Sequence, residues 1–208
     1  MESSDIHSAE DLEQFRQAEE WEKRIKKNGF YREHFFQAFS KQLNNIFDEP
    51  ISILEIGSGP GHLAEHIFHS VKVESYTLFD LSKSMNHIAL NRLKKYQSFI
   101  ECKVGDILCT ESFEGLGNFD AVICMQTIHE VRDKRLAVDI YKNVTKVLKP
   151  NGYFLVCDFV LGEQGMKEAD IYMTELEQNQ ALIDGGFKSP TLALSYAGLT
   201  LYFAQKKS

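Results

Sequence analysis

The sequence predicts one α/β domain: a doubly wound, mostly parallel sheet with a C-terminal antiparallel hairpin, preceded by N-terminal helices. Short apolar runs alternate with stretches of helical periodicity, which is typical of parallel strands joined by right-handed crossovers. The last two apolar runs are separated only by Ala197-Gly198, as in a hairpin. A length of 208 residues, with 43% hydrophobic and 25% charged residues, suits a single globular domain with a sizeable core.

The chain begins with a segment of helical character. Apolar and aromatic residues recur at helical spacing over residues 9 to 47, and Asn28-Gly29 interrupts the pattern. We therefore expect two helices there. We expect residues 1–48 to form a helical lid or extension and residues 49–208 to form the main domain.

The remaining helices and strands are predicted from apolar runs and from the capping and turn residues between them. Ser82 is a natural N-cap, Thr174 and Glu177 have capping-box spacing, and Pro150-Asn151-Gly152 signals a stop and turn. Gly185-Gly186 ends the last helix. The expected strands are 51–56, 73–79, 99–104, 119–125, 153–160, 191–196 and 199–205. The expected helices are 61–70, 82–96, 132–148 and 174–184.

Charge and cysteine usage limit the partners and the compartment. A formal net charge of -7 gives no general attraction to phosphate backbones, so we expect neither a nucleic-acid nor a membrane partner. The four cysteines form no C-x-x-C pair, which favours reduced thiols in a reducing cytosol. The polar, acidic N-terminus does not resemble a signal peptide, and no apolar run reaches about 18 residues. We expect a cytoplasmic monomer or homodimer.

The first expected strand runs into a glycine-rich loop, Glu55-Ile56-Gly57-Ser58-Gly59-Pro60-Gly61. Glycines at alternate positions allow a tight turn and a close approach to a ligand at the carboxyl ends of the strands. A dinucleotide fingerprint has the spacing G-x-G-x-x-G, but His62 occupies the third glycine position here. The loop therefore suits a nucleoside ligand without a pyrophosphate.

Two acidic residues follow the next two strands. Asp80 lies about 20 residues beyond the loop, where a carboxylate can hydrogen-bond ribose hydroxyls. Asp106 follows the third strand and could accept a hydrogen bond from the exocyclic amino group of adenine. Alone, each could be an ordinary loop aspartate, but three correctly placed strand ends make coincidence a poor explanation.

The ordered segments ILEIGSGPG (53–61), FDLSKSM (79–85), VGDIL (104–108), FDAVICMQTIHEV (119–131) and VLKPNGYFLVCDF (147–159) resemble the motifs of class I S-adenosylmethionine-dependent methyltransferases. The resemblance covers roughly residues 50 to 205. It implies a seven-stranded sheet, S-adenosylmethionine as cofactor and S-adenosylhomocysteine as product.

The resemblance also implies a set of cofactor-binding residues. The three glycines would line the methionine portion, with Glu55 supporting its amino group. Leu81 and Ile107 would contact the adenine, and Met125 and Gln126 would pass close to the sulfonium. The full set is Glu55, Gly57, Gly59, Gly61, Asp80, Leu81, Asp106, Ile107, Met125 and Gln126.

His129 and Glu130 are the candidate catalytic residues. They lie just beyond the fourth strand, and a histidine can accept a proton near neutral pH. Alternatively, His129 only packs against cofactor or lid, and Glu130 only starts a helix. Tyr31 and His34 could reach over the site as lid or substrate residues, although an aromatic-rich helix is also typical of a plain core.

Several features narrow the reaction class. The D/N-P-P-Y/F segment of amino-methylating nucleic-acid enzymes is absent after the fourth strand, and so are a paired-glutamate loop and the acid cluster of metal-dependent relatives. His62 and His66 have metal-ligand spacing but no evident third ligand, so we expect no metal. The short segment 161–173 favours a small-molecule acceptor, methylated at oxygen or nitrogen. The alternatives are a non-catalytic cofactor-binding module and, against the glycine spacing, a nicotinamide-dependent oxidoreductase.

Overall fold

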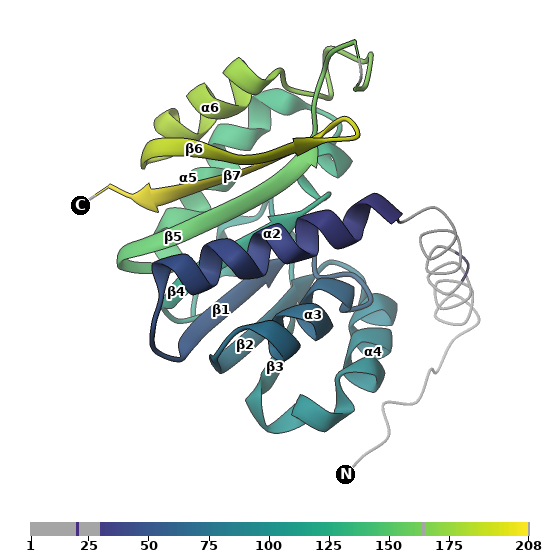
Figure 1. Cartoon of the computed structure of the whole chain (residues 1–208), viewed down its shortest axis with the longest axis vertical. Coiled ribbons are helices and arrows are strands. Elements are labelled where there is room, and N and C mark those ends of the chain that lie inside the picture. The colour runs from purple at the N-terminus through teal and green to yellow at the C-terminus, as the bar shows by residue number, and fades with distance from the viewer. Residues whose placement is uncertain (1–19, 21–29, 164, 208) are drawn as a thin grey trace.

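The computed structural model describes residues 20, 30–163 and 165–207. Its centre is a seven-stranded sheet with the order β3-β2-β1-β4-β5-β7-β6 (Figure 1). The strands are β1 (Ile51–Ile56), β2 (Val73–Asp80), β3 (Ile100–Val104), β4 (Phe119–Met125), β5 (Leu148–Phe159), β6 (Phe187–Tyr196) and β7 (Leu199–Lys206).

The strand directions confirm the predicted fold class. β1 pairs in parallel with both β2 and β4, and β3 and β5 extend the parallel part on either side. β7 lies between β5 and β6 and runs antiparallel to both. The chain leaves β1 toward β2 and β3 and then returns to place β4 on the other side. The topological switch point therefore lies between β1 and β4, where ligands bind in such sheets.

Helices cover the two faces of the sheet, as Figure 1 shows. On one face α2 (Phe30–Ile46), α3 (His62–Ser70) and α4 (Lys83–Arg92) contribute to one buried cluster. On the other face α5 (Ala137–Val147) and α6 (Glu175–Asp184) contribute to a second. Short 3-10 turns join these elements: η1 (Lys94–Phe99), η2 (Thr110–Phe113), η3 (Ile128–Val131) and η4 (Lys134–Leu136).

Both predicted helix caps are present. The Ser82 hydroxyl accepts a hydrogen bond from the Met85 amide and starts α4. Thr174 and Glu177 form a reciprocal capping box at the start of α6, which ends at Asp184, before Gly185 as expected.

The N-terminal segment is described only in part. α2 begins directly after Asn28-Gly29, where the periodicity breaks, and the first predicted helix lies outside the described residues. Phe35, Phe39 and Leu43 of α2 are fully buried against the sheet and α3. The division into 1–48 and 49–208 stays a prediction.

Four predicted boundaries were wrong, three of them in α4, α5 and β5 and one at the edge strand β6. The helix expected over 132–148 begins only at Ala137, because Arg132 has a left-handed backbone (φ 59°) and Asp133 caps the short turn η4 instead. Pro150-Asn151-Gly152 does not precede β5 but forms an irregularity within it, next to the register shift opposite β4. The helix expected over 82–96 ends at Arg92 and gives way to η1.

The edge strand β6 begins earlier than expected, at Phe187 instead of residue 191. Pro190 lies at a register shift between Lys188 and Thr191, which an edge strand tolerates because its outer amides need no partner. In the described part of the chain the four cysteines are free, with Cys124 and Cys157 buried and Cys109 exposed. No helix there is long and apolar enough to cross a membrane.

Candidate cofactor and active site

A pocket of about 560 Å³ opens at the carboxyl ends of the central strands, at the topological switch point. The glycine loop after β1 forms its floor, and the segments after β2, β3 and β4 form its walls. α2 contributes one side chain, Arg32. A second hollow of about 360 Å³ lies at the amino ends of the strands, on the opposite edge of the sheet from this site.

Gly57 is required by close packing as well as by its backbone. Its φ is 65°, and a Cβ atom there would collide with the side chain of Thr127. Its amide donates to the Phe79 carbonyl at 2.8 Å, which ties the loop to the end of β2. The loop and the segment after β4 therefore meet with no room for a side chain.

The other two loop glycines differ in what they face. Gly59 has φ 52°, and no atom lies within 4 Å of a Cβ built there, so this position borders open pocket space. Gly61 is the N-cap of α3, and a Cβ there would lie 3.1 Å from the Ala89 Cβ of α4. Gly61 is absent from the pocket wall, so its geometry supports helix packing and not ligand contact.

Asp80, at the end of β2, lines the pocket and holds the loop in shape. Its carboxylate accepts hydrogen bonds from the amides of Gly59 and Ser82, each at 2.8 Å. Burial raises the pKa of Asp80, and the two amide hydrogen bonds oppose that rise. A carboxylate fixed in this way can present its remaining lone pairs to a ligand.

Glu55 lies at the inner end of the pocket and is buried. The Tyr76 hydroxyl donates to its carboxylate at 2.6 Å. Burial raises the pKa of Glu55 to about 8, with the charge of Asp80 adding to the rise and the Tyr76 hydrogen bond and Arg32 opposing it. Glu55 is therefore mostly protonated at neutral pH.

The predicted adenine residues lie at the opposite end of the pocket, beside β2 and β3. Leu81, Asp106 and Ile107 all line it. Leu81 is 69% exposed, so its side chain offers an uncovered apolar surface to a flat ring. Asp106 accepts a hydrogen bond from the Leu108 amide at 2.9 Å, which fixes its carboxylate.

Met125 and Gln126 line the pocket after β4. Gln126 has a left-handed backbone with φ 56°, held by its amide, which donates to the Cys157 carbonyl at 2.7 Å. Its side-chain amide nitrogen donates to the Tyr31 hydroxyl at 3.4 Å, and its Oε1 is buried without a partner. Such strain and unmet polarity are typical of ligand sites.

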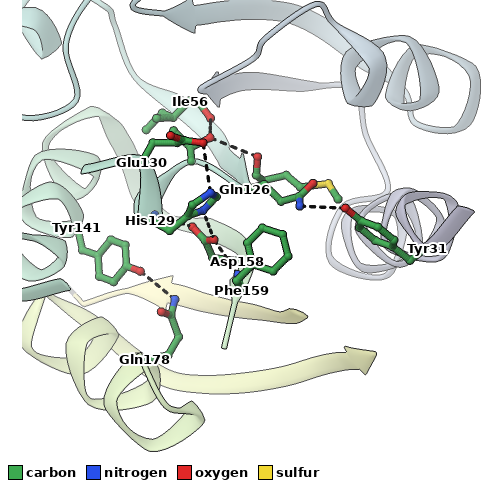
Figure 2. Close-up of polar contacts among 11 residues, drawn as sticks. Tyr31, Ile56, Gln126, His129, Glu130, Tyr141, Asp158, Phe159 and Gln178 are labelled. Carbon is green, nitrogen blue, oxygen red and sulfur yellow. Dashed lines mark hydrogen bonds and ion pairs between the residues drawn. The ribbon is translucent and has the colours of Figure 1, made fainter. Parts of the chain in front are cut away.

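His129 lies between two carboxylates, as Figure 2 shows. Its Nδ1 is 2.6 Å from Asp158 Oδ1, and its backbone amide donates to Asp158 Oδ2 at 3.1 Å. Its Nε2 is 3.3 Å from Glu130 Oε1. Burial alone would lower the pKa of His129. The hydrogen bonds to Asp158 and Glu130, together with the charges of these carboxylates, outweigh that effect and raise the pKa to about 9.

The His129 ring faces the end of β5 and does not line the pocket, whereas its neighbour Glu130 does. The ring packs edge-on against Phe159 at 5.1 Å and stacks beside Tyr172 at 5.8 Å between centroids. His129 is therefore at the rim of the cofactor pocket, on the side where aromatic side chains could hold an acceptor.

The two predicted lid residues are in different places. The Tyr31 hydroxyl contacts Gln126, which lines the pocket, although Tyr31 itself is not among the lining residues (Figure 2). His34 instead packs edge-on against Tyr196 of β6, with 5.0 Å between ring centroids, away from the pocket wall.

Sequence reasoning missed four residues at this site: Arg32, Tyr76, Thr127 and Asp158. Asp158 carries the clearest signal, since an aspartate ending the strand beside β4 lies near whatever follows β4. Tyr76 and Arg32 carry no such signal, because their roles depend on contacts across the sheet and from α2. In the described residues no group of acidic, histidine or cysteine side chains could hold a metal ion.

Comparison with known proteins adds to this geometry. The family profile described as a methyltransferase domain matches residues 54–154. An uncharacterized methyltransferase of Schizosaccharomyces pombe is 24% identical over 170 residues, which cover 78% of this chain and 58% of that protein. The citrinin polyketide synthase of Monascus ruber is 30% identical over 133 residues, which cover 61% of this chain and 5% of that protein.

A solved structure of an O-methyltransferase family protein from Burkholderia thailandensis has the same fold. The TM-score is 0.63 at 17% identity, over 76% of this chain and 51% of that chain. The chain thus spans about half the length of the Schizosaccharomyces pombe and Burkholderia thailandensis proteins and a small part of the polyketide synthase. The profile match shows a methyltransferase domain over residues 54–154, and the fold is that of class I methyltransferases, which generally use S-adenosylmethionine.

Proposed function

We propose that the chain transfers the methyl group of S-adenosylmethionine to an oxygen or nitrogen atom of a small-molecule acceptor, releasing S-adenosylhomocysteine. The observation that carries the proposal is the pocket at the switch point, where the glycine loop and the carboxyl groups of Glu55, Asp80 and Asp106 converge.

The pocket's polar groups fit this cofactor. Ser58 Oγ and Gln126 Oε1 are buried without partners beside it, which leaves hydrogen-bonding capacity for a polar ligand. Asp80 would bind the ribose hydroxyls, and Asp106 the adenine amino group. Leu81 and Ile107 would contact the adenine ring, as their positions on the wall allow.

The sulfonium of the bound cofactor supplies a methyl group that is already electrophilic. What the protein must add is alignment of the acceptor with that methyl group and exclusion of water. Met125 and Gln126, which line the pocket after β4, would lie beside the sulfonium. Tyr31 from α2 would help to close this end, since it contacts Gln126.

His129 would remove the acceptor's proton as a general base. The contact of its Nδ1 with Asp158 orients the ring, and because the pKa of His129 is about 9, Nε2 would accept a proton only in molecules whose ring is neutral. Glu130 contacts Nε2 and also lines the pocket. It would either accept the acceptor's proton from Nε2 or compete with Nε2 for that proton. The alternative is a purely packing role for His129 against Phe159 and Tyr172. In that case Asp158→Asn would leave the pH dependence of turnover unchanged.

A second acceptor class has support of its own. The relative from Monascus ruber is a polyketide synthase, and carbon atoms between carbonyl groups in a polyketide chain lose a proton readily. The base proposed here would serve such a carbon as well as a hydroxyl. Acceptor screening with phenols, amines and β-dicarbonyl compounds distinguishes the two classes, because each product carries its methyl group on a different atom.

Calorimetric titration tests the cofactor proposal. Wild-type protein is expected to bind S-adenosylhomocysteine and not NAD. Asp80→Ala should weaken that binding by about 1.5–3 kcal/mol, or roughly tenfold to more than a hundredfold, since it removes charge-assisted hydrogen bonds. Asp139→Ala, which removes an exposed carboxylate of α5, serves as control. A folded wild type that ignores S-adenosylhomocysteine would disprove the proposal, and binding of NAD instead would point to an oxidoreductase.

The net charge of -7 supports an acceptor other than a nucleic acid and a protein without a membrane partner. We propose a cytoplasmic monomer or homodimer with residues 1–48 acting as a lid. Light scattering of the purified chain, with and without S-adenosylhomocysteine, tests the oligomeric state.

A further inference from the structure

Arg32, in the first turns of α2, has a polar group with no partner. Its Nε is buried and makes no hydrogen bond, and no ion pair involves it in the part of the chain that the structure describes. Its guanidinium lies over the Phe36 ring, 5.7 Å from the centroid. A half-buried guanidinium without a carboxylate partner is unfavourable, because a desolvated charge needs compensation.

The surroundings of Arg32 make this more notable. It lines the cofactor pocket, and among the lining residues it is the only arginine or lysine. Four carboxyl groups line the same pocket, those of Glu55, Asp80, Asp106 and Glu130. Glu55 is close enough for its charge to interact with Arg32, but none of the four makes a hydrogen bond or an ion pair with Arg32 in the described residues. The pocket thus keeps one cation available for an anion that the protein does not supply.

The position of Arg32 selects which end of a ligand it meets. The adenine and ribose residues belong to the segments after β2 and β3. Arg32 instead lines the pocket together with Glu55 at the end of β1 and Gln126 after β4. In the order β3-β2-β1-β4 these two groups lie at opposite ends of the pocket. Arg32 therefore faces the part of the ligand farthest from the adenine.

We propose that Arg32 binds the α-carboxylate of the cofactor's amino-acid end, and that Gln126 Oε1 accepts a hydrogen bond from its ammonium group. The proposal rests on S-adenosylmethionine being the cofactor. At neutral pH that molecule and its product have a single anionic group, the carboxylate. Two of the three unpartnered atoms of pocket-lining residues, the donor Arg32 Nε and the acceptor Gln126 Oε1, match its two charged groups.

The strained backbone of Gln126 is consistent with a ligand site at this end of the pocket. Its φ of 56° places a non-glycine residue in the left-handed region, which is unfavourable unless contacts hold it there. A helix outside the glycine loop then completes the cofactor site, so α2 acts in binding and not only in the core.

The experiment compares two ligands that differ only in the carboxylate: S-adenosylhomocysteine and its decarboxylated analogue. Calorimetry on the wild type is expected to show that the carboxylate improves affinity about tenfold to a hundredfold. In Arg32→Met this preference should fall to about twofold or less, because only S-adenosylhomocysteine loses affinity. Arg32→Lys keeps the charge and should retain part of the preference. Lys41→Met, at an exposed position of the same helix, should retain all of it.

The outcomes separate this proposal from the one on which it rests. Equal affinity of the two ligands for the wild type, or equal weakening of both in Arg32→Met, overturns the role of Arg32 while leaving the cofactor in place. Binding of neither ligand to the folded wild type overturns the cofactor proposal itself. The comparison of ligands on the wild type needs no variant, so it stands even if Arg32→Met does not fold.

Discussion

The buried carboxyl of Glu55 gives a prediction that needs neither cofactor nor acceptor. Glu55→Gln replaces it with a neutral side chain of the same shape, whose oxygen can still accept the Tyr76 hydrogen bond. The variant therefore imitates the protonated form of Glu55 at every pH.

The magnitude follows from the difference in pKa between the two states. The pKa is about 8 in the folded protein against 4.5 for the unperturbed group. Between these values the folded state binds a proton that the unfolded state has lost, so stability falls as pH rises. The contribution is fully present below about pH 4.5 and is lost as the pH rises through about 8, with a slope of about 1.4 kcal/mol per pH unit.

Between pH 5.5 and 7.5 the stability of Glu55→Gln relative to wild type should therefore grow by about 2 to 3 kcal/mol. For a chain of this length that corresponds to a relative gain of about 5 to 10 °C in Tm. Urea and thermal unfolding of both proteins at several pH values measure it, with Glu74→Gln, at an exposed position of β2, as control. A difference that stays constant with pH would refute the reasoning, because Glu55 would then be ionised in the folded state.

Three further predictions concern the same site. Binding of S-adenosylhomocysteine at pH 7 should release close to one proton from Glu55, because the ligand's ammonium group favours the ionised carboxylate. The calorimetric binding enthalpy should therefore vary with the ionisation enthalpy of the buffer in wild type but not in Glu55→Gln. His129 must be deprotonated to act as a base, and its pKa is about 9, so turnover should rise with pH toward that value. Glu130→Gln should lower the pKa of His129 and so move this rise to lower pH. A pH profile that does not move in Glu130→Gln would argue against His129 as the base. Gly57→Ala should lower stability by about 1 to 3 kcal/mol or more, through its positive φ and its collision with Thr127. Gly59→Ala, with open space around it, should lose less stability but weaken S-adenosylhomocysteine binding, and equal losses in the two variants would contradict this account.

Local patterns in the sequence were sufficient for the fold. The alternation of apolar runs and helical periodicity specifies parallel strands with crossovers, and the final pair of runs specifies a hairpin. Caps at Ser82 and Thr174 were predictable because their hydrogen bonds join residues three apart. The boundaries that failed, around Arg132 and Pro150-Asn151-Gly152, depend on backbone conformations that distant strands impose.

Part of the candidate site could also be predicted from local patterns in the sequence. The glycine loop, Asp80 and Asp106 were recognisable because the carboxyl ends of parallel strands meet at one edge, whatever the details of packing. His34 resembled Tyr31 in sequence context, yet one turn of helix was enough to direct it to Tyr196 and away from the pocket.

By itself, then, the sequence determined the class of fold, the position of the ligand pocket and the resemblance to class I methyltransferases, because each follows from local order along the chain. The tertiary structure alone decided that the Tyr76 hydroxyl donates to the buried carboxyl group of Glu55 and that Asp158 orients His129. It alone also decided that Arg32 lines the pocket with its Nε making no hydrogen bond. These pairs join residues 21 to 29 positions apart or lie on different layers of the fold, and side-chain contacts between layers have no period that a sequence can display.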